Sequence, residues 1–307
     1  MAAKTLLKSG KKLKAGLFSD KVSAWLFLAP ASLFLFITAL LPLLYSVYLS
    51  FFRLKMNLPN QVPVFIGFDN YIRGFADEVL LTSIRNTLVF AVISVLAQLA
   101  LGLIVAVFIC DDNKWARIGV SIFIIPMIMA PVAAGTLWRM MLDSSTGVIN
   151  YFMNILGIPN ISWLAQPVTA MIAIIIVNVW QLTPWCTVIL VAGLKALPTD
   201  CLQASLVDGA SRWQIFWRII FPLILPLLIV VLMIRFIDAF KVFDTVYVMT
   251  GGGPGTATEM LPNFIYRQGL RFFDVGYAAS LAILFVLIMT LCSILFTRWR
   301  KKEEVDF

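Results

Sequence analysis

The sequence predicts an all-α, polytopic membrane protein with six transmembrane helices and a cytoplasmic loop built as helix, glycine, helix. Its 307 residues are 61% hydrophobic and only 13% charged, which is far more apolar than a soluble domain. The apolar residues fall into long runs, and the excess basic residues behind the net charge of +8 cluster at the two ends. Basic flanks mark the cytoplasmic side of a membrane, so we expect both termini in the cytoplasm and no role in nucleic-acid binding.

The composition also argues against several functions. Histidine, the commonest general base and metal ligand, is absent, which weighs against a membrane hydrolase or oxidoreductase. The four cysteines have no CxxC spacing, so we assign them neither a disulfide nor a metal. The chain contains no G-x-x-x-x-G-K-[ST] motif. We therefore predict that it binds no cofactor and is not itself an ATPase.

The N-terminal third is predicted to hold a tail, two spans and the loop between them. Residues 1–23 carry six lysines and form a basic cytoplasmic tail. The apolar run 24–52 is too long for a signal-peptide core and forms the first span of the membrane domain, 24–297. Residues 53–85 form a periplasmic loop. A second span over about 87–110 ends in a tight cytoplasmic turn at residues 111–117.

The middle third is predicted to hold two spans that differ in character. The third, about 118–141, contains Pro126 and Pro131, which remove backbone hydrogen bonds and would kink the helix within the membrane. The loop 142–167 is nearly uncharged and should pack on the outer surface. The fourth span, 168–194, has a polar and aromatic middle. That middle contains Asn178, Trp180, Gln181 and Trp185.

The fifth span begins at Ile219 and is purely apolar only to Ile234. A charge series of alternating sign follows at steps of three: Arg235, Asp238, Lys241 and Asp244. One helix over 219–248 would be about 45 Å long, against a hydrocarbon core of about 30 Å, so its outer half must leave the lipid or line water. A glycine-rich turn ends it. The sixth span ends near Thr297, and residues 298–307 form a basic cytoplasmic tail.

Residues 195–218 form a polar segment between two apolar runs. Two pairs have the capping-box spacing, which predicts two short helices: Asp200 with Gln203, and Ser211 with Gln214. Gly209 lies between them, where a left-handed backbone would end the first helix. An apolar ridge recurs at steps of three and four along the segment: Leu202, Leu206, Ala210 and Trp213. Such a ridge outside the bilayer requires a partner.

This loop resembles the "EAA" coupling loop of permease subunits from binding-protein-dependent ABC importers. Its residue pattern resembles that of the carbohydrate (maltose-permease) branch. The matching positions are Ala204, Asp208, Gly209, Ala210, Ser211, Phe216, Ile219 and Pro222. Two positions depart from the family pattern, because Gln203 stands where Glu is usual and Ser205 where Ala is usual. Similar phrases occur at 67–71, 86–87, 147–150 and 250–256, the last resembling the family's "T-GGP" signature.

The resemblance implies a permease subunit of an ATP-driven importer that moves a carbohydrate or sugar derivative across the inner membrane by alternating access. It implies several partners: a second homologous permease, two cytoplasmic ATPase subunits that bind ATP and Mg²⁺, and a periplasmic or lipid-anchored solute-binding protein. Eight loop residues would seat in the ATPase by this resemblance: Gln203, Ala204, Ser205, Asp208, Gly209, Ala210, Trp213 and Phe216.

Polar residues inside spans are candidates for solute contact, because each is costly in lipid unless it faces a cavity or a partner. Asn178 and Gln181 suit sugar hydroxyls, and Trp180 and Trp185 offer flat apolar faces; the alternative is that the two amides only bridge helices. The alternative for Arg235 and Asp238 is a self-paired charge ladder. If Arg235 does touch the solute, an anionic sugar derivative joins neutral oligosaccharides and polyols as a candidate, because guanidinium binds carboxylate, phosphate or sulfonate through two hydrogen bonds.

Two other functions compete with the importer. An ion-coupled secondary transporter would use the charge series of the fifth span as a relay and would need no ATPase partner. A structural scaffold would leave the coupling loop without a role. Exposed apolar residues in a cytoplasmic loop favour the importer over both.

Overall fold

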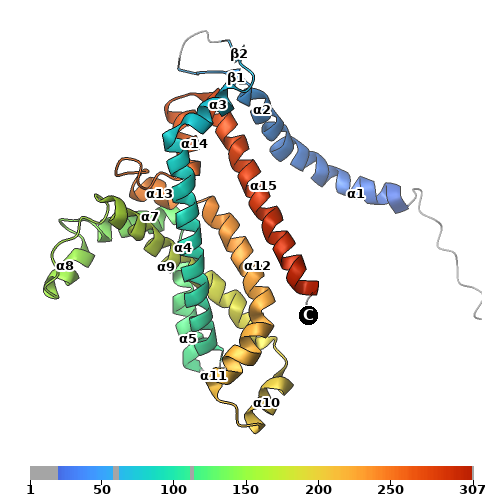
Figure 1. The fold of residues 1–307 in the computed structure, drawn as a ribbon, viewed down its shortest axis with the longest axis vertical. Helices are drawn as coiled ribbons and strands as arrows, with labels where there is room; N and C mark the ends of the chain where they lie inside the picture. Colours follow the sequence, from blue (N-terminus) through green and yellow to red (C-terminus); the bar gives the residue numbers. More distant parts are fainter. Residues whose placement is uncertain (1–19, 58–61, 111–113, 306–307) are drawn as a thin grey trace, which may run out of the picture.

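The computed structural model describes residues 20–57, 62–110 and 114–305. Most of the predicted basic tail, and residues 111–113 of the predicted cytoplasmic turn, lie outside this description. Within it, five helices are long and apolar enough to span a membrane, and a sixth span results if one strongly bent helix pair is counted. Figure 1 shows that helices dominate the chain. The predicted all-helical polytopic fold is confirmed.

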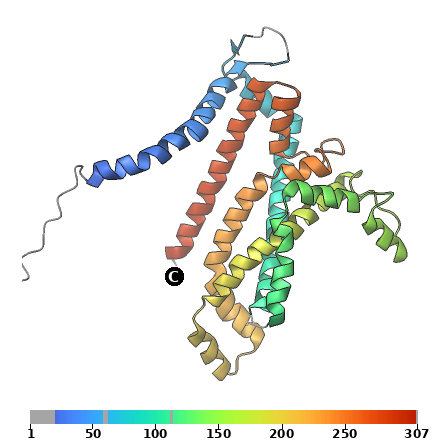
Figure 2. The same cartoon turned by 180° about the vertical axis from the view of Figure 1, so that it is seen from behind.

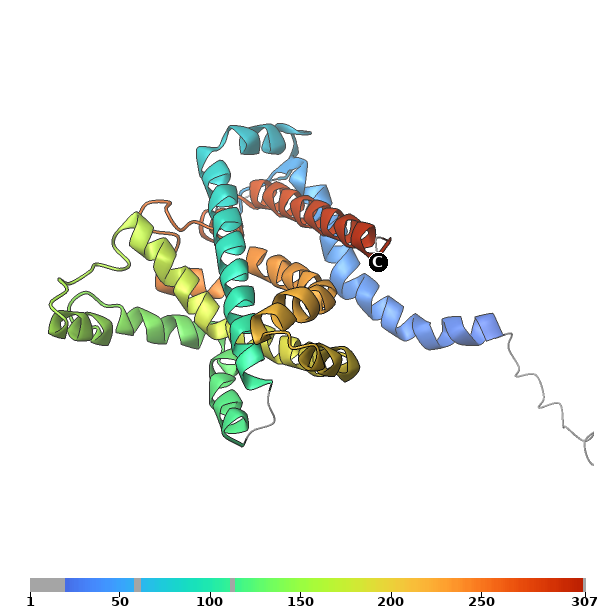
Figure 3. The same cartoon turned by 60° about the horizontal axis from the view of Figure 1, so that its bottom comes forward.

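The N-terminal region is helical up to a small hairpin. α1 (Asp20–Leu35), the π-helical turn η1 (Phe36–Leu40) and α2 (Leu41–Ser50) form one helical stretch. The antiparallel strands β1 (Phe52–Arg53) and β2 (Val64–Phe65) follow. α2 packs against the last helix of the chain, whereas the helical stretch before α2 lies away from the bundle in Figures 2 and 3.

The second span is longer than predicted. After the short α3 (Asp69–Ala76), α4 extends over Glu78–Ile109, so the helix begins nine residues before Thr87. The cause is Asp77, whose carboxylate accepts hydrogen bonds from the backbone of Val79 at 2.9 Å and of Leu80 at 3.4 Å. This cap satisfies N–H groups that a helix start leaves free.

The third span is broken where only a kink was predicted. α5 (Lys114–Phe123) and α6 (Ile125–Ile128) are followed by α7 (Pro131–Met141), and the two halves meet at 100°. Met129 and Ala130 are both extended, with ψ of 138° and 136°. A proline disfavours the helical conformation in the residue before it, so Pro131 starts a new helix instead of bending the old one.

The fifth span also ends earlier than predicted. α8 (Val148–Ile155) and α9 (Pro167–Lys195) precede the loop helices α10 (Thr199–Val207) and α11 (Arg212–Ile215). The chain then runs through η2 (Phe216–Ile220) into α12 (Phe221–Phe240). A turn over 241–243 separates α12 from α13 (Asp244–Met249), so the expected single helix over 219–248 is wrong. The turn leaves the side chain of Lys241 54% exposed instead of carrying its charge along a helix in lipid.

The core forms where α4 packs against α9 and α12. Fully buried side chains here include Phe90, Ile174, Leu190 and Ile224. α14 (Leu261–Tyr266), η3 (Arg267–Arg271) and α15 (Val275–Val305) complete the described chain. Figure 1 places α10 and α11 at one end of the molecule and the β1–β2 hairpin, α3 and α14 at the other.

Candidate coupling loop and solute cavity

The loop between α9 and α12 is a pair of short helices joined by a left-handed glycine. Gly209 has φ of +76°, as predicted. The backbone N–H of Gly209 donates to the carbonyl of Leu206 at 3.1 Å, and that of Ala210 donates to Ser205 at 3.0 Å. These bonds satisfy carbonyls that the end of α10 would leave free.

One of the two predicted capping boxes is present. The hydroxyl of Ser211 accepts from the backbone of Gln214 at 3.3 Å, and the Gln214 side chain accepts from the backbone of Ser211 at 2.8 Å. The box predicted for Asp200 and Gln203 is wrong, because α10 begins at Thr199 after Pro198 and has no side-chain cap. Asp200 therefore lies inside the first turn, where its carboxylate complements the helix dipole.

The loop leaves large apolar side chains exposed. Leu206 is 62%, Val207 89% and Trp213 71% exposed. Trp217 and Trp213 form an edge-to-face pair with their ring centroids 5.5 Å apart. The predicted ridge is therefore present at Leu206 and Trp213, whereas Leu202 and Ala210 are half-buried. The sequence prediction missed the exposed Val207 and Trp217.

The other predicted coupling residues divide into three groups. Gln203, Ala204 and Asp208 are exposed, Phe216 is half-buried, and Ser205 is buried and donates to the carbonyl of Leu202.

A cavity of about 280 Å³ lies among the middle of α9, the break before α7 and the end of α12. Four predicted solute residues line it: Asn178, Gln181, Arg235 and Asp238. Unpredicted residues complete the wall: Met127, Met129, Pro131, Leu182, Val242, Phe243 and Thr245, with Lys241 and Asp244 of the charge series. The broken spans thus contribute residues that straight helices would have carried elsewhere.

A polar network connects the cavity to three spans. Gln98 of α4 is fully buried and donates to the side-chain oxygen of Asn178 at 2.7 Å. Arg235, 4% exposed, donates through Nε to Gln98 Oε1 at 3.0 Å. The sequence prediction missed Gln98, although a glutamine inside an apolar run was the same kind of signal that identified Gln181.

Gln181 connects the cavity to the broken span. Its side-chain nitrogen donates to the backbone carbonyl of Met129 at 2.9 Å. Met129 lies where the third span breaks, so this bond partly replaces the helical hydrogen bonds lost there. Gln181 therefore bridges helices and also lines the cavity, and its contact with the solute stays a prediction.

The two predicted tryptophans lie outside the cavity lining. The centroid of the Trp185 ring lies 5.6 Å from the Arg235 guanidinium carbon, a cation–π contact. Trp180 packs edge-to-face against Trp138 of α7, with ring centroids 5.5 Å apart. Both rings therefore position helices around the cavity, and direct solute contact by either stays a prediction.

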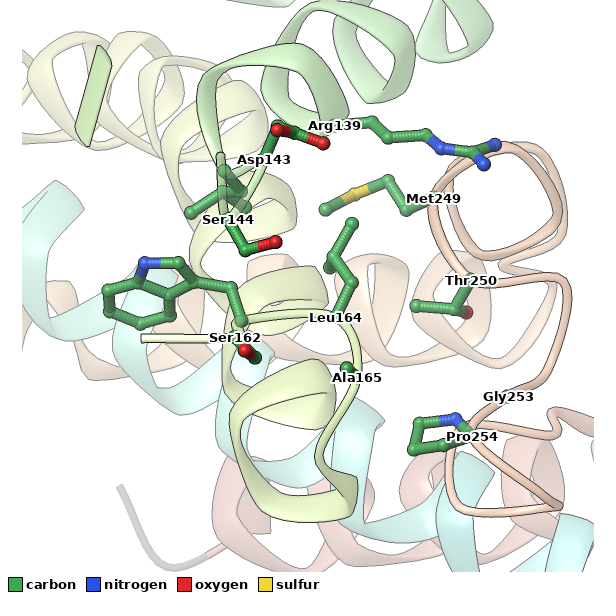
Figure 4. A pocket seen from close by; sticks show the side chains of 12 residues that line it. Arg139, Asp143, Ser144, Ser162, Leu164, Ala165, Met249, Thr250, Gly253 and Pro254 are labelled. Carbon is green, nitrogen blue, oxygen red and sulfur yellow. The ribbon is translucent and has the colours of Figure 1, made fainter. Parts of the chain in front are cut away.

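A larger cavity of about 380 Å³ lies where α7 ends, beside the glycine-rich turn after α13 (Figure 4). Asp143 lines this cavity, and its carboxylate is held in place. Its Oδ1 accepts hydrogen bonds from the backbone and hydroxyl groups of Thr146 and Ser145. These bonds, led by the Thr146 backbone, hold the pKa of the Asp143 carboxyl well below its usual range. Arg139 donates to the carbonyl of Val248 at 2.9 Å. The polar lining of this cavity thus ties α7 to the segment after it and to α13.

Comparisons with known proteins identify the family of the chain. A family model described as "Binding-protein-dependent transport system inner membrane component" matches residues 14–302. The trehalose/maltose transport system permease protein of Thermococcus litoralis is 34% identical, over 87% of this chain and 90% of the relative. The sulfoquinovosyl glycerol transport system permease protein of Agrobacterium fabrum is 33% identical, over 92% of each chain.

The fold also has a solved counterpart. A chain in the crystal structure of a bacterial alginate ABC transporter, in complex with alginate pentasaccharide-bound periplasmic protein, superposes with a TM-score of 0.79. It is 22% identical, and the match covers 92% of this chain and 95% of that one. With the helical fold and the family match over nearly its whole length, the chain belongs to the binding-protein-dependent transport system inner membrane components, the multi-pass permease subunits of ABC importers.

Proposed function

We propose that this permease carries a carbohydrate or sugar derivative through the cavity around Asn178, Gln181, Arg235 and Asp238, with the loop 195–218 seated in a cytoplasmic ATPase. One observation carries the proposal. The exposed Trp213 and the buried Arg235 lie on a single helical segment, Arg212–Phe240, which forms one candidate span. A movement imposed on the loop is therefore transmitted directly to the wall of the cavity.

The relatives support the class of solute. The names of the Thermococcus and Agrobacterium permeases refer to a disaccharide pair and to a sulfonated sugar glycoside, and the solved counterpart imports alginate. The cavity offers amides and charged groups that can pair with hydroxyls. The surrounding complex, on this proposal, contains a second homologous permease and two ATPase subunits, with both termini of this chain in the cytoplasm.

The test compares two substitutions of Gly209 in the whole complex reconstituted in vesicles. Gly209→Pro cannot adopt φ of +76° and loses an N–H that donates to Leu206, whereas Gly209→Asn tolerates the left-handed region. We expect Gly209→Pro to abolish ATP-dependent sugar uptake and solute-stimulated ATP hydrolysis, while the complex still inserts. Gly209→Asn should retain most of both activities.

Two results would contradict the proposal. Uptake that persists in Gly209→Pro would show that the loop does not transmit the ATPase movement. Uptake that follows the membrane gradient without ATP would instead favour an ion-coupled transporter that uses the charge series.

A further inference from the structure

The guanidinium of Arg235 has an unused edge inside the solute cavity. Nε donates to Gln98 at 3.0 Å, and Nη1 contacts Asp238 Oδ2 at 3.3 Å. Nη2 is buried and has no hydrogen-bond partner among the residues that the structure describes. A buried cationic donor without an acceptor is costly, so this edge requires a ligand atom or water.

The hydrogen-bond network fixes which way the neighbouring amides face. Arginine can only donate, so Gln98 must present its oxygen to Arg235 and its nitrogen to Asn178. Asn178 must then present its oxygen to Gln98, which leaves its Nδ2 group turned away from this bond. Nδ2 makes no hydrogen bond within the described part of the chain, and Asn178 lines the cavity. The inner wall therefore offers donors from two residues, Arg235 and Asn178.

The charges around the cavity are unevenly placed. Asp238 is shared between two cations, since its other oxygen lies 3.2 Å from Lys241 Nζ. The side chains of Asp238 and Lys241 are 44% and 54% exposed, and Asp244 is also exposed. The four charges sum to zero, but Asp238 is half exposed and also pairs with Lys241, so it offsets the charge of the buried Arg235 only in part. The inner wall is consequently positive.

We propose that this cavity takes the negatively charged group of an acidic sugar derivative, bearing a carboxylate, sulfonate or phosphate, on Arg235 Nη2 and Asn178 Nδ2. The inference rests on the proposed function and narrows its solute class. A guanidinium edge beside a second donor matches an oxyanion, which accepts both bonds at once. Gln181 Oε1, an acceptor that makes no bond in the described part, remains for a sugar hydroxyl.

The test measures binding of methyl glycosides to the purified permease–ATPase complex in nanodiscs, without the binding protein, by equilibrium dialysis. The probes are neutral and acidic partners that differ only at C6, in gluco, galacto and manno forms: hydroxyl, carboxylate and sulfonate. For at least one form, we expect wild type to bind an acidic partner at least tenfold more tightly than the neutral one. Arg235→Met should reduce this preference to about twofold or less, and Arg235→Lys should retain part of it.

A second variant is expected to change the preference in the opposite direction, so the test remains decisive even if Arg235→Met misfolds. Asp238→Asn removes the competing carboxylate but leaves the buried guanidinium in place, so the preference for the acidic sugar should widen several-fold. Lys241→Met, at the exposed rim, should change it less than Arg235→Met does.

The outcomes separate this inference from the proposed function. Equal or tighter binding of the neutral sugars, or a preference that Asp238→Asn leaves unchanged, overturns the acidic specificity while sugar transport stands. Failure of every sugar to bind overturns the acidic specificity, and ATP-driven uptake of a solute other than a sugar would overturn the carbohydrate proposal as well.

Discussion

Gln98 holds Arg235 and Asn178 in place from the neighbouring helix α4. Sequence reasoning found the cavity residues of α9 and α12 because polar side chains stand out in apolar runs. It could not rank Gln98 with them, because the contact joins residues that are 80 and 137 positions apart. The same limit applies to Trp180, whose contact with Trp138 depends on the direction that α7 takes after the break.

Replacing Gln98 should destabilise the protein more than its size suggests. Gln98→Leu keeps the volume but leaves Arg235 Nε and Asn178 Oδ1 without partners, and each unpaired buried group costs about 1–3 kcal/mol. We expect a clear fall in the thermal unfolding midpoint of the purified complex. Ile93→Leu, at a 48% exposed position of the same helix, is the matched control and should leave the midpoint unchanged. An equal midpoint in Gln98→Leu would mean that the network contributes little.

The elements follow the sequence where local chemistry decides them. The Ser211 capping box and the left-handed Gly209 were readable because each depends on residues a few positions apart. The start of α4 was also readable in principle from Asp77, which precedes the helix as a cap. The 100° break at Pro131 was not, because proline alone does not say whether a helix bends or restarts. The end of α12 likewise depends on where the charged residues reach water.

The close approach of α15 to β1 makes a specific prediction about the end of the molecule that carries the β1–β2 hairpin. A Cβ added at Gly276 would collide with the carbonyl oxygen of Phe52, a backbone atom that cannot turn aside. Gly276→Ala should therefore lower the unfolding midpoint and increase proteolysis of the hairpin region. Gly119→Ala, on a helix with no atom within 4 Å of the added Cβ, should be neutral or slightly stabilising. Equal effects of the two changes would contradict the predicted collision.

At the scale of the molecule, the bundle of α4, α9 and α12 joins a polar cavity to a loop with an exposed apolar face. ATP is bound and hydrolysed by separate ATPase subunits, as family membership establishes. The helical polytopic fold, with five to six candidate spans, and the left-handed glycine between the loop helices could be predicted from hydropathy and motif. The cavity could not, because its wall is assembled from helix breaks whose geometry depends on long-range packing.

The exposed loop face should carry much of the affinity for the ATPase. Buried tryptophans at interfaces often contribute about 2 kcal/mol or more, which corresponds to roughly thirtyfold in affinity. We expect Trp213→Ala to reduce co-purification of the ATPase subunits and to lower stimulated ATP hydrolysis. Phe152→Ala, at a 60% exposed position on α8, is the control and should not affect retention of the ATPase. Full retention by Trp213→Ala would place the contact elsewhere.

On the proposed function, the continuous helical segment Arg212–Phe240 would also act as a lever. Trp213 and Arg235 are 22 positions apart, a separation of about 33 Å along a helix axis. If the segment tilts by about 10° around its lower end, Arg235 is displaced by roughly 6 Å, more than the length of a hydrogen bond. If the loop seats in an ATPase as proposed, a modest rotation at the Trp213 end would thus break and remake the contact between Arg235 and Gln98. How far Arg235 moves for a given rotation would then depend on the stiffness of this helical segment, including its π-helical turn at Phe216–Ile220.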